Sequence, residues 1–144
     1  MNMTGREAFE KQDVFGIGAP NDAYAQYFIG QSYLKPLTVP GACPVFLANV
    51  TFEPGCRNNW HIHHATKGGG QILVCTAGEG WYQEEGKPAV ELKPGMVITI
   101  PPEVKHWHGA KKDSWFSHIA VEIPGEECRN EWCEPVSDEA YSKL

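Results

Sequence analysis

Positive charge is scarce in this chain: 12 Lys and Arg residues stand against 18 Asp and Glu, for a formal net charge of −6. No cluster of Lys or Arg offers a track for a phosphate backbone, which argues against nucleic acid as a partner. Long apolar runs are absent as well, since none approaches the roughly 18 residues that a membrane-spanning helix needs. We therefore expect neither nucleic acid nor a membrane as a partner.

The cysteines form no recognisable pattern either. There are five of them, an odd number, and no two are spaced as C-x-x-C. The N-terminal stretch MNMTGREAFEKQ has no apolar segment of the kind found in secretory signals. A disulfide framework would be accompanied by an even count and a secretory signal, so we expect reduced thiols and a cytoplasmic location.

Turn signals divide the sequence into three zones, which we assign to one domain. Residues 45–122 hold short apolar runs, separated by Gly and Pro about every 8–12 residues. This spacing predicts antiparallel strands that close into a sandwich or small barrel. Residues 1–44 are expected to form an N-terminal arm with the first strands of that domain, and residues 123–144 a C-terminal extension.

The two ends carry weaker signals. Thr4 and Glu7 have the spacing of a capping box, which predicts a short helix at the start of the chain. A strand is expected near residues 26–34. The C-terminal extension is expected to be loop-like as far as Ser137, which predicts the N-cap of a short final helix.

All six histidines lie between His61 and His118. His61 and His63 form one pair with a spacing of two residues, and His106 and His108 form another. Residues i and i+2 of a strand point to the same face, so both pairs can direct their rings into one interior. Neutral imidazole is the commonest metal ligand in proteins, and the spacing therefore predicts a metal site inside the barrel.

The histidines stand within two gapped motifs. The first motif runs through Gly55, His61, His63, Gln71 and Gly78, and the second through Gly95, Pro101 and His106. In order and spacing they resemble the two motifs of the cupin superfamily, over residues 50–122. The resemblance implies an all-β fold, the cupin double-stranded β-helix or jelly-roll barrel, with short helical or irregular segments at both ends. It also implies a set of four metal ligands, namely His61, His63, Gln71 and His106.

Gln71 departs from the usual family pattern, in which a Glu supplies this ligand. A neutral Gln leaves the charge of a divalent ion uncompensated, which makes the ion a stronger Lewis acid and a better anion trap. The alternative is a Gln71 that only hydrogen-bonds a neighbour or orients a water. Imidazole and oxygen donors suit one divalent transition metal per chain, whether manganese, iron, zinc, nickel or cobalt, and manganese is favoured only by the family resemblance.

A narrower resemblance involves Trp60-His61, Gly70-Gln71, the phrase KHWHG at residues 105–109 and His118. These residues are similar to those of the manganese-containing cupin hydroxynitrile lyases and of carboxymuconolactone decarboxylase-associated cupins. The resemblance implies that His108 and His118 act near the substrate, as acid/base groups or hydrogen-bond partners. Alternatively, His108 only orients a metal ligand through a hydrogen bond. His64 directly follows a ligand and is expected to face away from the site.

Together these observations predict a metal-dependent enzyme of lyase or isomerase type. Its substrate is expected to be a small oxygenated molecule, anionic or enolisable, with the metal as Lewis acid and His108 or His118 as the acid/base group. The alternatives are an iron-dependent cupin dioxygenase and a non-catalytic cupin that binds a small molecule. A homodimer is expected through the sheets and the aromatic N-terminal segment.

Overall fold

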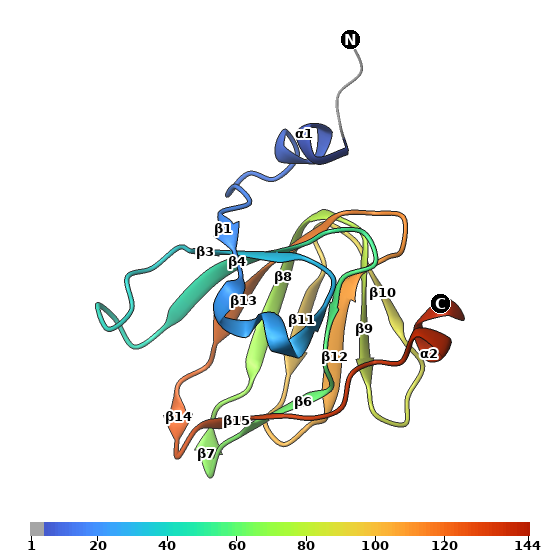
Figure 1. The fold of residues 1–144 in the computed structure, drawn as a ribbon. Helices are drawn as coiled ribbons and strands as arrows, with labels where there is room; N and C mark the ends of the chain where they lie inside the picture. Colours follow the sequence, from blue (N-terminus) through green and yellow to red (C-terminus); the bar gives the residue numbers. More distant parts are fainter. Residues whose placement is uncertain (1–4) are drawn as a thin grey trace.

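The computed structural model describes residues 5–144, and it consists of two antiparallel sheets that face each other (Figure 1). The six-stranded sheet has the order β1-β3-β4-β13-β8-β11. Its strands are β1 Ala19–Pro20, β3 Ser32–Pro36, β4 Phe46–Phe52, β13 Phe116–Glu122, β8 Gln71–Gly78 and β11 Val97–Ile100. Strand β13 lies between β4 and β8, both from distant parts of the chain, as expected for the jelly-roll barrel predicted from the sequence.

The second sheet has seven strands, with the order β10-β9-β12-β5-β2 along its main path. These strands are β10 Val90–Leu92, β9 Gly80–Glu84, β12 His106–Ala110, β5 Arg57–Asn58 and β2 Phe28–Ile29. Strand β6, His61–His64, pairs with β12 and also with β15, Arg129–Trp132. A separate two-stranded sheet joins β7, Lys67–Gly68, to β14, Gly125–Glu126.

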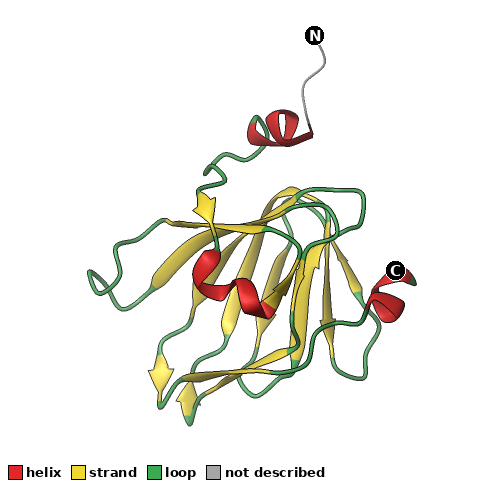
Figure 2. Ribbon diagram, viewed as in Figure 1, coloured by secondary structure: helices red, strands yellow, loops and turns green. Residues whose placement is uncertain are grey.

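Helices are short and lie outside the sheets (Figure 2). They are α1 Gly5–Glu10, the 3-10 helix η1 Asp22–Tyr27 and α2 Asp138–Ser142. The predicted cap of α2 is confirmed, because the Ser137 hydroxyl accepts a hydrogen bond of 3.1 Å from the backbone N–H of Ala140. The Thr4 half of the predicted capping box lies outside the described residues.

Two expectations about the terminal zones are wrong in part. The strand expected near residues 26–34 is divided into η1, β2 and β3, with a turn at Gly30 whose φ is +87°. The C-terminal extension is not loop-like before Ser137, because it contains β14 and β15. The sequence RNEW of β15 lacks alternating apolar residues, since this strand pairs at an exposed sheet edge rather than over the core.

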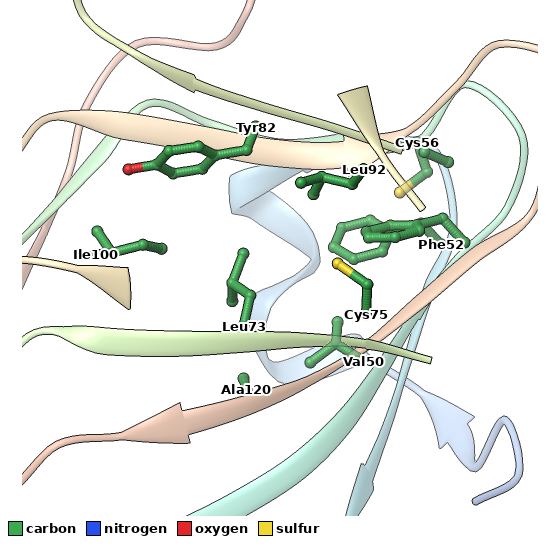
Figure 3. Packing of buried hydrophobic residues seen from close by; sticks show 11 residues of the cluster. Val50, Phe52, Cys56, Leu73, Cys75, Tyr82, Leu92, Ile100 and Ala120 are labelled. Carbon is green, nitrogen blue, oxygen red and sulfur yellow. The ribbon is translucent and has the colours of Figure 1, made fainter. Parts of the chain in front are cut away.

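Apolar side chains from both sheets fill part of the barrel interior. Figure 3 shows this cluster: Val50, Phe52, Cys56, Leu73, Cys75, Tyr82, Leu92, Ile100, Ala110, Phe116 and Ala120. The ring of Phe52 also lies against two of the histidines, with centroid distances of 5.5 Å to His118 and 6.0 Å to His108. The apolar core therefore borders the histidines and excludes water from their inner side.

The outer face of the six-stranded sheet is covered by the N-terminal segment. The buried carboxylate of Asp13 accepts hydrogen bonds from Asn49 Nδ2 and Ser117 Oγ at 3.0 Å and from Thr51 Oγ1 at 3.3 Å. Ser117 precedes His118 on β13, so alternation along the strand places one residue in this outer cluster and the other inside the barrel. Asp13 thus holds β4 and β13 together from behind the histidines.

Replacing Asp13 with Ala should lower the free energy of unfolding by about 2–3 kcal/mol, because three buried donors lose a shared acceptor. Urea denaturation of the two proteins measures this difference. The matched control is Asp113→Ala at an exposed position, for which we expect a change within about 0.5 kcal/mol. Equal stability of the Asp13 variant and the wild type would show that the cluster does not anchor the N-terminal segment.

Candidate metal centre

Three histidines meet at the junction of β6 and β12. His61 and His106 are direct cross-strand partners, and their ring centroids lie 4.2 Å apart. His63 follows two residues later on β6, with its ring 5.2 Å from each of the other two. One ring nitrogen of each histidine falls within 4.8 Å of the others, so the three can hold one metal ion together. The sequence spacing correctly predicted that these rings share a face.

Each of the three rings is fixed in orientation through its Nδ1 atom. In every case Nδ1 lies 2.8 Å from a carbonyl oxygen: the pairs are His61 with Asn59 O, His63 with Asn130 Oδ1 and His106 with Val104 O. A carbonyl oxygen only accepts hydrogen bonds, so Nδ1 carries the proton of each neutral ring. The Nε2 lone pairs are thereby left free, as metal ligation requires.

Several atoms with a free lone pair are buried around this centre and have no hydrogen-bond partner in the described part of the chain. They are Nε2 of His63, Nε2 of His106 and Oε1 of Gln71. Gln71 begins β8 on the opposite sheet, and its side chain is 9% exposed. A buried polar atom without a partner costs about 1–3 kcal/mol. A cation held by the three histidines would satisfy the two ring nitrogens, and Gln71 lines the same cavity with its free oxygen, so the residues fit a divalent transition metal.

Burial also keeps the histidines in the form that binds metal. Burial lowers the pKa of His106 to about 4. Burial, with the neighbouring His106 adding to it, lowers the pKa of His61 well below its ordinary value. Metal binding requires neutral imidazole, so no proton has to be displaced from these two rings at neutral pH.

His108 and His118 form a second, adjacent pair. His108 lies two residues beyond His106 on β12, and His118 reaches in from β13 of the opposite sheet. Nδ1 of His108 and Nε2 of His118 are 3.0 Å apart. Both rings are buried, which lowers the pKa of His118 to about 3 and that of His108 well below its ordinary value. The pair is therefore neutral at physiological pH, as the apolar neighbours of His118 on β13 predicted.

A cavity of about 210 Å³ adjoins both groups of histidines. His61, His63, Gln71, His108 and His118 supply its polar wall, and Phe28, Leu34, Val50 and Trp132 belong to its apolar wall. Among the described residues that line it, Glu122 is the only charged side chain. The cavity thus offers a small organic molecule both polar and apolar surface.

The C-terminal extension contributes to the site in a way that the sequence did not predict. Strand β15 pairs with β6 and places Asn130 opposite His63 and Trp132 opposite His61. The Trp132 ring lies 4.7 Å from the ring of His61, and it stacks on Tyr27 at 4.4 Å with an interplanar angle of 3°. No local pattern in RNEW marks these contacts, because they depend on the register between distant strands.

His64 points away from the centre, as expected from its place directly after a ligand. Its Nε2 lies 2.8 Å from a carboxylate oxygen of Glu131, and its Nδ1 bonds to Glu103. The hydrogen bond to Glu131 raises the pKa of His64 most, and the hydrogen bond to Glu103 raises it further. His64 therefore serves as an internal comparison for the buried histidines.

The fold and the three-histidine centre define a small β-barrel protein whose histidines could hold a metal ion. A family profile for the cupin domain matches residues 48–121. The (R)-mandelonitrile lyase of Granulicella tundricola is 39% identical over 129 residues, covering 89% of this chain and 95% of that protein. The chain belongs to the cupin family, as its two motifs predicted.

Solved structures support the same assignment. A cupin-like protein from Thermotoga maritima superimposes with a TM-score of 0.77 at 38% identity, over 91% of this chain and 96% of that chain. A predicted oxalate decarboxylase from the same organism has a TM-score of 0.63 at 20% identity, over 86% and 99%, and shares the fold. In residues 5–144, no helix is both long and apolar enough to cross a membrane.

The metal content of variants that lack a single side chain should distinguish metal ligands from neighbouring residues. We expect about one transition-metal ion per chain in the wild type, lost in His61→Ala and His106→Ala. Asn130→Ala should retain the site but weaken the metal by about 10- to 100-fold, because His63 loses the acceptor that orients it. His64→Ala is the control and should bind metal like the wild type. Elemental analysis with competitive chelator titration measures all four, and equal metal content in every variant would contradict the site.

Acid should destabilise the metal-free protein through the buried histidines. Histidine in the unfolded chain takes up a proton near pH 6.5, whereas folded His106 and His118 do so only near 4 and 3. The free energy of unfolding should therefore fall as the pH drops below about 6.5, by about 1.4 kcal/mol per pH unit for each such histidine. Urea denaturation at several pH values measures the slope. In His118→Phe one histidine no longer contributes, so the slope should decrease by about 1.4 kcal/mol per pH unit. An unchanged slope would contradict a neutral, buried His118.

Proposed function

We propose that the protein is a metal-dependent cupin lyase that interconverts a cyanohydrin with a carbonyl compound and hydrogen cyanide. One observation carries this proposal: a single cavity is lined both by candidate metal ligands that lack a hydrogen-bond partner and by the neutral pair His108 and His118. The relative named (R)-mandelonitrile lyase supports it, since 39% identity extends over 95% of that protein. The substrate and the direction of the reaction are part of the proposal.

Cleavage of a cyanohydrin needs only proton movement and the rupture of one carbon–carbon bond. The hydroxyl group gives up its proton and becomes the carbonyl oxygen. The electron pair of the broken bond leaves with cyanide, which then takes up a proton to form hydrogen cyanide. No oxidant, reductant or organic cofactor is consumed, so a small single-domain barrel suffices for this chemistry.

The residues of the chain divide this task between two groups. His61, His63, Gln71 and His106 would hold the divalent ion, which supplies Lewis-acid chemistry when bound. His108 and His118 would move the proton, because they are the neutral imidazoles at the cavity wall outside the ligand set. Manganese is our preferred ion, on the resemblance to manganese-containing cupin lyases.

The cavity wall favours a neutral substrate over the anionic one expected from the sequence. Phe28, Leu34 and Trp132 offer an apolar surface for the organic part of the molecule. Among the described lining residues there is no Lys or Arg to pair with a carboxylate, and Glu122 would repel one. A neutral cyanohydrin or aldehyde matches this wall, with its oxygen directed toward the histidines.

The proposal is tested by following benzaldehyde release from (R)-mandelonitrile, with the protein loaded with manganese and after removal of the metal by chelator. Turnover should require the metal and should fall by about 10²- to 10⁴-fold in His118→Ala, with metal content unchanged. The control His64→Ala should react like the wild type. A fully metal-loaded protein that releases no benzaldehyde above background would refute the lyase, and substrate-dependent oxygen uptake by an iron-loaded protein would replace it with the dioxygenase.

A further inference from the structure

Asn58 makes two contacts with a single histidine. Its Oδ1 accepts a hydrogen bond of 2.9 Å from the backbone N–H of His108. Its Nδ2 lies 3.2 Å from Nε2 of the His108 ring and 3.4 Å from Nδ1. Asn58 is 3% exposed and His108 4% exposed, so both contacts are shielded from water.

The first contact fixes the direction of the second. A backbone N–H only donates, so the Asn58 atom that faces it must be the carbonyl oxygen. The other atom is then the amide nitrogen, which also only donates, and the facing nitrogen of His108 must accept. Nε2 of His108 is the nearer nitrogen, and Nδ1 has another partner in His118 at 3.0 Å. Nε2 therefore accepts from Asn58, and Nδ1 carries the proton of the neutral ring.

The same argument continues to the next ring. Nδ1–H of His108 donates to Nε2 of His118, so the proton of neutral His118 lies on its Nδ1, a buried atom without a hydrogen-bond partner among the described residues. Both nitrogens of His108 are then engaged, one by Asn58 and one by His118. Nε2 of His118 becomes free to take a substrate proton once its hydrogen bond from His108 is released. Nε2 of His108, if protonated, would face the N–H of Asn58, which cannot accept a hydrogen bond.

We infer that Asn58 is a positioning residue that fixes the tautomers of His108 and His118, so that His118 is the ring that exchanges a proton with the substrate. The tautomers follow from the hydrogen-bond geometry together with the neutrality of both buried rings. The assignment of proton exchange to His118 rests on the proposed function, in which either ring of the pair could move the proton.

The backbone explains how Asn58 comes so close to His108. Arg57 of β5 is the cross-strand partner of Gly109 on β12. A Cβ atom at Gly109 would lie 2.6 Å from Cα of Arg57, which is closer than non-bonded carbons approach. Glycine at position 109 thus lets β5 lie tightly against β12, and the tight pairing brings Asn58 within hydrogen-bond distance of the ring.

The tautomers can be read directly from the ring nitrogens. We would record ¹⁵N spectra of the protein with ¹⁵N-labelled histidine, loaded with diamagnetic zinc so that the centre stays filled. The wild type should show His108 and His118 each with a protonated Nδ1 and a bare Nε2. A wild-type His108 with its proton on Nε2 would overturn the inference without any variant being made.

Asn58→Asp is the informative substitution, because it keeps the oxygen that accepts from the His108 backbone and replaces the donor with an acceptor. The proton of His108 should move to Nε2, and His118 should change to the Nε2–H form. Gln12→Glu is the control, since it makes the same change from amide to carboxylate at an exposed position of the N-terminal segment and should leave both tautomers unchanged. Unchanged tautomers in a folded Asn58→Asp protein would overturn the inference.

The effect on catalysis is a separate measurement. In Asn58→Asp, kcat for mandelonitrile cleavage should fall by about 10- to 100-fold at unchanged metal content. An altered tautomer with unchanged kcat would overturn the assignment of proton exchange to His118. If the wild type cleaves no mandelonitrile, the proposed function fails, while the spectra still decide whether Asn58 sets the tautomers.

Discussion

The structure depends on one constraint: a polar nitrogen buried in a barrel must find a partner. The three histidines of the candidate metal centre meet it on one side of each ring only, because carbonyl oxygens occupy Nδ1 and leave Nε2 free. Gln71 of the facing sheet has an unpaired carbonyl oxygen and lines the same cavity. The unpaired atoms cost stability in the absence of an ion, and the same cost becomes affinity for a cation that satisfies them.

The two faces of β13 show how the barrel supports this arrangement. Ser117 faces outward into the cluster organised by Asp13, and His118 faces inward against Phe52. One strand is therefore held on its outer face by hydrogen bonds and on its inner face by apolar contact. Side chains in such a position have little freedom, which is what the proton-moving group of the proposed lyase would need to keep its geometry.

Much of this site could be predicted because strand alternation is local. The spacing of two within each histidine pair placed the rings on one face, and the two motifs gave the cupin fold. Asn58 and Asn130 could not be predicted, since their contacts with His108 and His63 arise from registers between strands that are far apart in the sequence. The C-terminal loop prediction failed for a related reason: β15 is defined by its pairing with β6, and its own sequence is polar.

The charges around the centre bear on which molecule it accepts. Gln71 is neutral, and its cross-strand partner on β13 is Glu122, the one carboxylate among the described cavity-lining residues. A bound divalent ion would attract negative charge, whereas the carboxylate of Glu122 at the cavity wall would repel it. For the proposed lyase, such a centre would favour a molecule that is neutral overall and becomes anionic only at the atom that reaches the metal. A cyanohydrin losing its hydroxyl proton meets this condition, and a dicarboxylate does not.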